Sequence, residues 1–200
     1  MKSRFHPSLL VATAMGLLMM SCLLPGMIPL KSTPTGPMPK LETDANQMLT
    51  VLQGKDWQYL EALAKEQYSQ EDFAKPGTLK YTVTIADNQP VYFNYGWCAV
   101  DETTLKQNFE HIHVKMYING EELGKDVVHQ LSYASQDKMV CLDHGVLTSD
   151  WPEGTYDLKA VATFDEKIND GIADYEPGDY IFEYKVTVNK QKEGTQAPSG

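Results

Sequence analysis

The sequence of 200 residues carries little positive charge. It contains 17 lysine and arginine residues against 27 aspartate and glutamate residues, so its formal net charge is −10 at pH 7. An acidic chain that also lacks a local cluster of basic residues repels nucleic acid and anionic lipid headgroups. Nucleic acid is therefore not among the partners that we expect.

The short motifs of common catalytic sites are missing as well. The sequence has no Gly-x-Ser-x-Gly elbow, no His-Glu-x-x-His pair, no phosphate-binding glycine loop and no dinucleotide fingerprint. Many acids are available for a glycosidase carboxylate pair, but no feature of the sequence singles out two of them. We therefore expect no enzymatic activity, no catalytic residue and no resident cofactor.

The apolar run of residues 9–20 is too short to cross a bilayer comfortably as a helix. Lys2 and Arg4 precede it, which is the order of a bacterial secretion signal. Cys22, directly after Met19-Met20-Ser21, resembles the lipobox of bacterial lipoproteins, although the two methionines depart from that pattern. The resemblance implies that Cys22 is lipidated and becomes the mature N-terminus. The alternative is an ordinary signal peptide in which Cys22 has no such role.

Composition divides the chain into five parts. These are a signal peptide at 1–21, the lipidated cysteine with a proline-rich tether at 22–40, a helical segment at 41–78, a β domain at 79–190 and a disordered tail at 191–200. We expect the N-terminal lipid to hold the protein on a membrane of the cell envelope, with the β domain on the extracytoplasmic side.

Only three cysteines are present, and Cys98 and Cys141 remain once Cys22 is assigned to the anchor. Two cysteines in an exported domain predict a disulfide. Strict alternation places Cys98 on the strand face opposite Trp97. Either Gly96 forms a bulge that rotates the register, or the bond ties the strand end to a neighbouring segment at the surface. We favour the second arrangement.

Two short helices are expected ahead of the strands. Thr43 or Asp44 can cap the first, which runs to about Gln53, and Asp56 can cap the second. In the second helix, Trp57 is interpreted as a packing anchor. Helices in this position also occur in cone-shaped α+β folds of the nuclear-transport-factor type, which is an alternative fold.

Residues 91–100 alternate apolar side chains and predict a central β-strand. Asn119-Gly120 predicts a hairpin turn. The further expected strands share this period-two pattern and lie near residues 79–86, 112–118, 127–133, 139–143, 156–164 and 180–188. Seven strands separated by turns favour an antiparallel β-sandwich.

The segment Trp151-Pro152-Glu153-Gly154-Thr155-Tyr156-Asp157-Leu158 resembles the corner that enters the sixth strand of immunoglobulin-like domains. The resemblance covers residues 79–188 and makes Tyr156 the structural corner tyrosine. It implies a mainly β, immunoglobulin-like antiparallel sandwich of about seven strands, preceded by the two helices. Cys141 departs from the antibody pattern, because it precedes the corner.

Metal ligands are spread thinly. His111 and His113 share one strand face, but solvent-facing histidines are the expected arrangement, and His129 and His144 are too distant in sequence to assign. The loop of residues 165–179 is rich in the oxygen donors that calcium prefers, although it does not fit the calcium-loop template. Its candidate binding residues are Asp165, Asp170, Asp174 and Asp179.

These features predict a lipid-anchored binding or structural module of the envelope, whose partner is an envelope protein or a polysaccharide. The first candidate surface is the acidic loop, because scaffold loops usually carry recognition. A second hypothesis is carbohydrate binding through Tyr92, Tyr117 or Tyr175 as exposed aromatics. A third is a small-ligand protein or accessory enzyme on the cone-shaped fold.

Overall fold

The computed structural model describes residues 37–64, 67, 73–135 and 137–190. The predicted signal peptide, Cys22, the tether as far as residue 36 and the tail at 191–200 lie outside the described residues. No helix in the described part is both long and apolar enough to cross a membrane.

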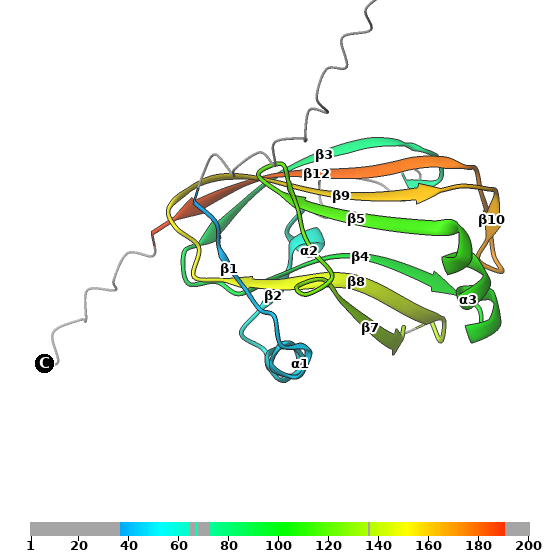
Figure 1. Cartoon of the computed structure of the whole chain (residues 1–200), viewed down its shortest axis with the longest axis horizontal. Coiled ribbons are helices and arrows are strands. Elements are labelled where there is room, and N and C mark those ends of the chain that lie inside the picture. The colour runs from blue at the N-terminus through cyan, green and yellow to red at the C-terminus, as the bar shows by residue number, and fades with distance from the viewer. Residues whose placement is uncertain (1–36, 65–66, 68–72, 136, 191–200) are drawn as a thin grey trace, which may run out of the picture. The chain divides into compact units, whose positions relative to one another are not determined.

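Two five-stranded sheets form the domain, and Figure 1 shows them as two layers. Sheet A has the order β1 (Lys40–Leu41), β8 (Val140–Ser149), β4 (Val91–Ala99), β2 (Gln58–Tyr59), with β7 (His129–Ala134) also paired to β8. Sheet B has the order β3 (Gly77–Ala86), β12 (Gly178–Asn189), β9 (Gly154–Phe164), β5 (Ile112–Ile118), β6 (Glu121–Glu122). A separate ribbon joins β10 (Ile168–Asn169) to β11 (Asp174–Tyr175). The helices are α1 (Ala45–Gln53), α2 (Leu60–Ala64) and α3 (Glu102–His111).

The mainly β prediction is confirmed, but the sheets are mixed. The described residues contain twelve strands, of which seven have six residues or more. β12 pairs antiparallel with β9 and parallel with β3, and β2 pairs parallel with β4. The prediction of a purely antiparallel sandwich is therefore wrong at these two pairs. β9 occupies one edge of β12, and β3 runs along the other edge in the same direction as β12. Alternation along a strand carries no information on the direction of its partner, so the sequence could not predict the parallel pairs.

The core lies between the two sheets and is rich in aromatic rings. Phe93 packs edge-on against Tyr184 at 6.0 Å between ring centroids, and Trp97 packs edge-on against Phe164 at 5.3 Å. These contacts join β4 of sheet A to β12 and β9 of sheet B. The apolar residues that alternate along 91–97 therefore do point into the core as one row of side chains.

β4 is less central than predicted. β8 has long neighbours on both sides, whereas β2 covers β4 only at Val91 and Tyr92. The helix α2 contacts both β4 and β3, and its Leu60 and Ala64 are buried in the core. A helix thus covers the side of the sandwich where sheet A has no further long strand. The cone-shaped alternative requires a single curved sheet, in contrast to the two facing sheets observed.

The first helix forms with the predicted bounds, and the second begins later than predicted. Asp44 caps α1, since its Oδ1 accepts from the backbone N–H of Asn46 at 2.8 Å. The second helix begins at Leu60 rather than directly after a cap at Asp56, because Gln58–Tyr59 pairs with β4 instead. Trp57 is a packing anchor, since its ring lies against the buried Met48, Tyr92 and Leu147 and its Nε1 donates to the Leu52 carbonyl at 3.0 Å.

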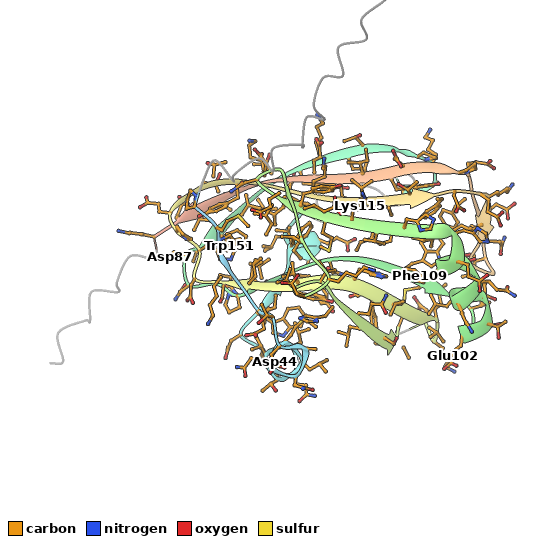
Figure 2. The ribbon with its side chains drawn as sticks, in the orientation of Figure 1. Asp44, Asp87, Glu102, Phe109, Lys115 and Trp151 are labelled. Atoms are coloured by element: carbon orange, nitrogen blue, oxygen red, sulfur yellow. A yellow bond between two sulfur atoms is a disulfide. The ribbon has the colours of Figure 1, made fainter. Side chains whose placement is uncertain are left out.

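The backbone angles at Asn119-Gly120 and the hydrogen bond of Tyr156 describe the two turns that the sequence marked. Asn119 and Gly120 adopt φ of 51° and 81°, as the hairpin from β5 to β6 requires. The Tyr156 hydroxyl donates to the Pro152 carbonyl at 2.6 Å, and its ring packs edge-on against the buried Trp151, which is labelled in Figure 2. Tyr156 therefore ties the start of β9 to the turn before it.

The disulfide between Cys98 and Cys141 is confirmed. The two residues lie directly opposite each other on β4 and β8, with 4.0 Å between their Cα atoms. Both point away from sheet B, opposite to Trp97, and no bulge at Gly96 is needed. The bond ties one strand end to its neighbour, as predicted, but it does not lie at the surface, because Cys141 has 0% of its surface exposed.

Removing the disulfide is expected to lower the free energy of unfolding. The bond closes a loop between residues 43 apart, which in the loop-entropy model corresponds to about 4 kcal/mol. We expect the Cys98→Ala/Cys141→Ala variant to lose an amount of this order in urea unfolding. Reduction of the wild-type protein serves as the matched control and should cause a similar loss. An unchanged unfolding midpoint in both cases would contradict the prediction.

Candidate functional site

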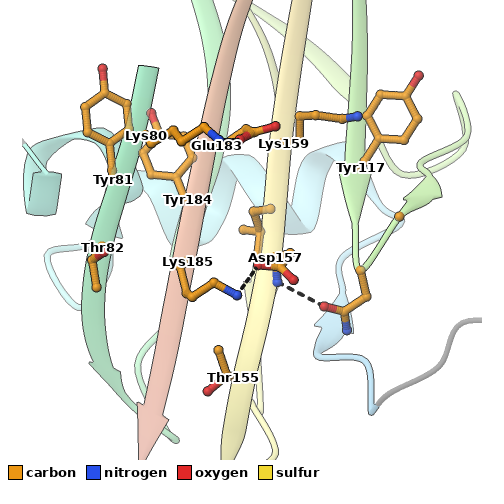
Figure 3. Close-up of a pocket in the computed structure, with 13 residues that line it drawn as sticks. Lys80, Tyr81, Thr82, Tyr117, Thr155, Asp157, Lys159, Glu183, Tyr184 and Lys185 are labelled. Atoms are coloured by element: carbon orange, nitrogen blue, oxygen red, sulfur yellow. Dashed lines mark hydrogen bonds and ion pairs between the residues drawn. The ribbon is translucent and has the colours of Figure 1, made fainter. Parts of the chain in front are cut away.

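The outer face of sheet B contains a groove of about 820 Å³ (Figure 3). Outward side chains of β3, β12, β9 and β5 form its floor, and the Asn119-Gly120 turn lies at one margin. The outward charged and aromatic members are Lys80, Tyr117, Asp157, Lys159, Glu183 and Lys185, and the buried Tyr81 and Tyr184 also line the groove. The groove therefore presents mostly polar and charged groups, together with a tyrosine ring.

Strand register sets these side chains in rows that cross the sheet. In the first row, Lys80 lies opposite Glu183, which lies opposite Lys159, which lies opposite Tyr117. In the second row, Lys185 lies opposite Asp157. Because side chains on one face of a sheet occupy every second residue, four strands supply one continuous patterned surface.

The contacts within the rows are exposed. Lys185 Nζ lies 2.7 Å from Asp157 Oδ1, and Lys80 Nζ lies 3.4 Å from Glu183 Oε2 (Figure 3). Lys159 Nζ lies 4.5 Å from the centre of the Tyr117 ring and pairs with no carboxylate within the described residues. Exposed pairs of this kind contribute only about 0–1 kcal/mol each, so a ligand can replace them at little cost.

The acidic loop is arranged differently from a metal site. Asp165 accepts from His111 and His113, whose hydrogen bonds lower the pKa of its carboxyl, and Asp179 accepts from Thr163. Asp170 accepts from two backbone N–H groups and from the Tyr175 hydroxyl, and Asp174 accepts from Asn169 and pairs with Lys167. The four carboxylates thus have different protein partners, and no metal-ligating group of three or more is found among the described residues.

The four candidate histidines lie in two separate parts of the fold. His111 Nδ1 and His113 Nε2 lie 2.9 Å and 3.1 Å from the two Asp165 oxygens, and both side chains are partly exposed. His129 and His144 belong to sheet A, where His144 packs against Phe109 and burial lowers its pKa. The fold therefore does not bring the four histidines together.

The three aromatics proposed for a sugar platform do not form one. Tyr92 has 0% of its surface exposed and lies on the outer side of sheet A under Trp57. Tyr175 packs edge-on against Trp97. Tyr117 belongs to the groove. The prediction that Tyr92 is exposed is wrong, because α1 and Trp57 cover that end of the sheet.

A buried polar cluster on the outer face of sheet A was missed by reading the sequence. Asp143 of β8 has 0% of its surface exposed, and its Oδ2 accepts from Asn94 Nδ2 at 2.9 Å. Its Oδ1 accepts from the Tyr133 hydroxyl at 3.3 Å. Burial raises the pKa of this carboxyl to about 6, which its two hydrogen bonds only partly oppose.

Two glycines make room for the cluster. A Cβ at Gly96 would lie 2.3 Å from Asp143 Oδ1, and a Cβ at Gly145 would lie 2.4 Å from the end of the Tyr92 ring. Glycine inside a strand often marks such a close approach. The two strand glycines were therefore the signal in the sequence from which the cluster could have been inferred.

The burial of Asp143 predicts a pH dependence of stability. Its folded pKa of about 6 is above the ordinary 3.8, so the stability that it contributes is present below about pH 4 and is lost as the pH rises through 6. The free energy of unfolding falls by up to about 3 kcal/mol over this pH range. We expect Asp143→Asn to remove this loss of stability at high pH, so that the variant is more stable than the wild type at pH 7.5 in urea unfolding.

Asp126→Asn is the matched control, because Asp126 is an exposed carboxylate in a turn. It should follow the wild-type curve at every pH. A difference between Asp143→Asn and the wild type that stays constant from pH 4 to pH 7.5 would show that the Asp143 proton does not couple to folding.

Comparison with known proteins adds little. No protein-family model matches the chain, and no curated protein matches it. Among solved structures, PbICP-C in complex with falcipain-2 is similar with a TM-score of 0.32 and 12% identity, over 58% of this chain and 92% of that chain. A likeness at this level carries no argument about function, so the proposals below depend on the residues themselves.

Proposed function

We propose that the protein is a lipid-anchored, extracytoplasmic binding module without catalytic activity, and that its ligand lies in the groove of sheet B. The observation that carries the proposal is the patterned floor of the groove, where three lysines, two acids and a tyrosine face outward from adjacent strands. Such a surface can hydrogen-bond a polar ligand along its length. The rigid sheet beneath it keeps the donors and acceptors at set spacings.

The fold that we propose for this module is the immunoglobulin-like sandwich. The hydrogen bond from Tyr156 to the Pro152 carbonyl supports it, since corner tyrosines of that family donate to backbone a few residues upstream. The two facing sheets support it too. The disulfide departs from the antibody arrangement, because it joins neighbours in one sheet instead of bridging the two sheets.

The location proposed is the extracytoplasmic side of a membrane in the envelope. The Cys98–Cys141 disulfide supports export, because such bonds persist in oxidising compartments. The order of basic residues, apolar run and Cys22 supports the lipid anchor. Five prolines between residues 25 and 40 support a tether that holds the sandwich away from the membrane surface.

An envelope polysaccharide is the ligand class that the groove fits best. Carboxylates, ammonium groups and the Asn119 amide can exchange hydrogen bonds with sugar hydroxyls, and the Tyr117 ring offers an apolar surface to a sugar face. The acidic loop is a weaker candidate, because its carboxylates already accept from protein donors.

Groove variants are expected to weaken polysaccharide binding. Calorimetric titration of the protein with a panel of envelope polysaccharides should find at least one saturable ligand. We expect Tyr117→Ala and Lys159→Ala each to raise its Kd about five- to tenfold, because a single ring contact or hydrogen bond contributes on the order of 1 kcal/mol.

Lys106→Ala is the matched control, since Lys106 is an exposed lysine on α3 and lies outside the groove. It should leave the Kd unchanged. Flat titrations across the whole panel, or a ligand whose affinity is the same in the groove variants, would contradict the proposed site.

The anchor can be tested separately through Cys22. In bacterial cells that carry out lipoprotein processing, the wild-type protein should incorporate labelled fatty acid and sediment with membranes. We expect Cys22→Ser to abolish labelling and to shift the protein to the soluble fraction. Equal labelling of the wild type and Cys22→Ser would show that this cysteine is not the lipidated residue.

A further inference from the structure

The Asp143 carboxylate is buried and has no cationic partner in the part of the chain that the structure describes. Within the described residues it forms no ion pair with a lysine or histidine, and its hydrogen bonds come from the neutral donors Asn94 and Tyr133. The side chain nearby that acts on it through charge is Glu61, which is also an acid. A buried charge is normally paired, so an anion in this setting favours the approach of a positive group.

Two further acceptors in the same patch have no partner among the described residues. The Tyr92 hydroxyl and the Asn94 Oδ1 are both buried and accept no hydrogen bond there. Asn94 lies opposite Gly145 in the β4–β8 ladder, and the end of the Tyr92 ring lies over that same glycine. The patch thus combines a carboxylate with two unfilled acceptors.

Aromatic rings enclose this patch. Trp57, Tyr59 and Tyr92 pack edge-on against one another, with ring centroids 4.6 to 6.1 Å apart. Burial raises the pKa of Tyr59, Tyr92 and Tyr133, and the nearby Asp143 charge raises it further. Aromatic faces attract cations, and the attraction is strongest where water is excluded.

A cation with several N–H donors matches these groups. An alkylammonium carries three donors and no acceptor, whereas the patch supplies a carboxylate and two unfilled acceptors. A divalent metal fits less well, since no group of three or more His, Cys, Asp or Glu ligands occurs in the described part of the chain.

We propose that the outer face of sheet A holds a second binding site, in which Asp143 pairs with a ligand alkylammonium group while the Asn94 Oδ1 and the Tyr92 hydroxyl accept its N–H groups. The site is closed in this structure. Tyr59 and Tyr133 are the exposed members, at 38% and 40%, and together they form its outer cover. The ammonium replaces the Tyr133 hydroxyl, whose 3.3 Å hydrogen bond to Asp143 is the longer of the two. The inference is independent of the groove.

Binding of n-butylammonium to the full chain tests the site. Two-dimensional amide NMR at pH 7.5, with sodium chloride at equal ionic strength as the reference, should show saturable shifts at the Gly96 and Gly145 amides and at the Asn94 side-chain amide. We expect Asp143→Asn to weaken binding at least about tenfold, because it removes a charged hydrogen-bond acceptor. Asp126→Asn, the exposed carboxylate control, should bind as the wild type does.

A second variant tests one of the unfilled acceptors without changing the charge of Asp143. Tyr92→Phe retains the ring over Gly145 and removes only the hydroxyl, so we expect about a threefold to tenfold weaker affinity with an unchanged fold. Choline, which has no N–H donor, should bind more weakly than n-butylammonium. The absence of saturable shifts in the wild type, or equal affinities in the wild type and both variants, would overturn the proposal.

The same NMR experiment distinguishes two sources of the ammonium group, a lysine side chain of a partner protein and a free amine. Nα-acetyl-lysine amide presents the group as a protein side chain does. Tighter binding of this probe than of n-butylammonium supports a lysine of a partner protein, and equal or weaker binding supports a free amine. Both results support the site, because each depends on Asp143.

Discussion

The antiparallel ladder between β4 and β8 is the interaction on which the rest of the structure depends. Its inner face carries Phe93 and Trp97, whose rings pack against sheet B and hold the two layers together. Its outer face carries the Cys98–Cys141 bond and the buried Asp143. Since successive residues of a strand point to opposite faces, one pair of strands supplies both the core and the covered polar cluster.

The two candidate sites differ in how they balance charge. In the groove of sheet B, lysines and acids lie in water and pair with one another, so each contact is weak and exchangeable. On sheet A, the Asp143 carboxylate is withdrawn from water, and neutral donors compensate it only in part. The first surface suits an extended polar ligand bound through many small contributions. The second suits a single positive group bound through one strong contribution.

Local patterns predicted the local structure well. Alternation located most of the long strands, Asn119-Gly120 marked a hairpin and Asp44 capped a helix, because each of these depends on neighbouring residues. The disulfide joins cysteines 43 residues apart and was predicted from the cysteine count of a chain expected to be exported. The second helix began later than predicted, since Gln58–Tyr59 pairs with a strand that is distant in sequence. Alternation does not report pairing partners, so the parallel contact of β3 with β12 was not foreseen.

The sequence by itself determined where most of the long strands lie and which face of each is apolar, because side-chain period and turn chemistry are local properties. Only the tertiary structure decided what those faces meet. The groove requires the register of β3, β12, β9 and β5, and the burial of Asp143 requires Gly96, Tyr133 and Tyr59 to arrive from three other strands. Burial and charge balance are properties of that assembled neighbourhood, so no single stretch of the chain carries them.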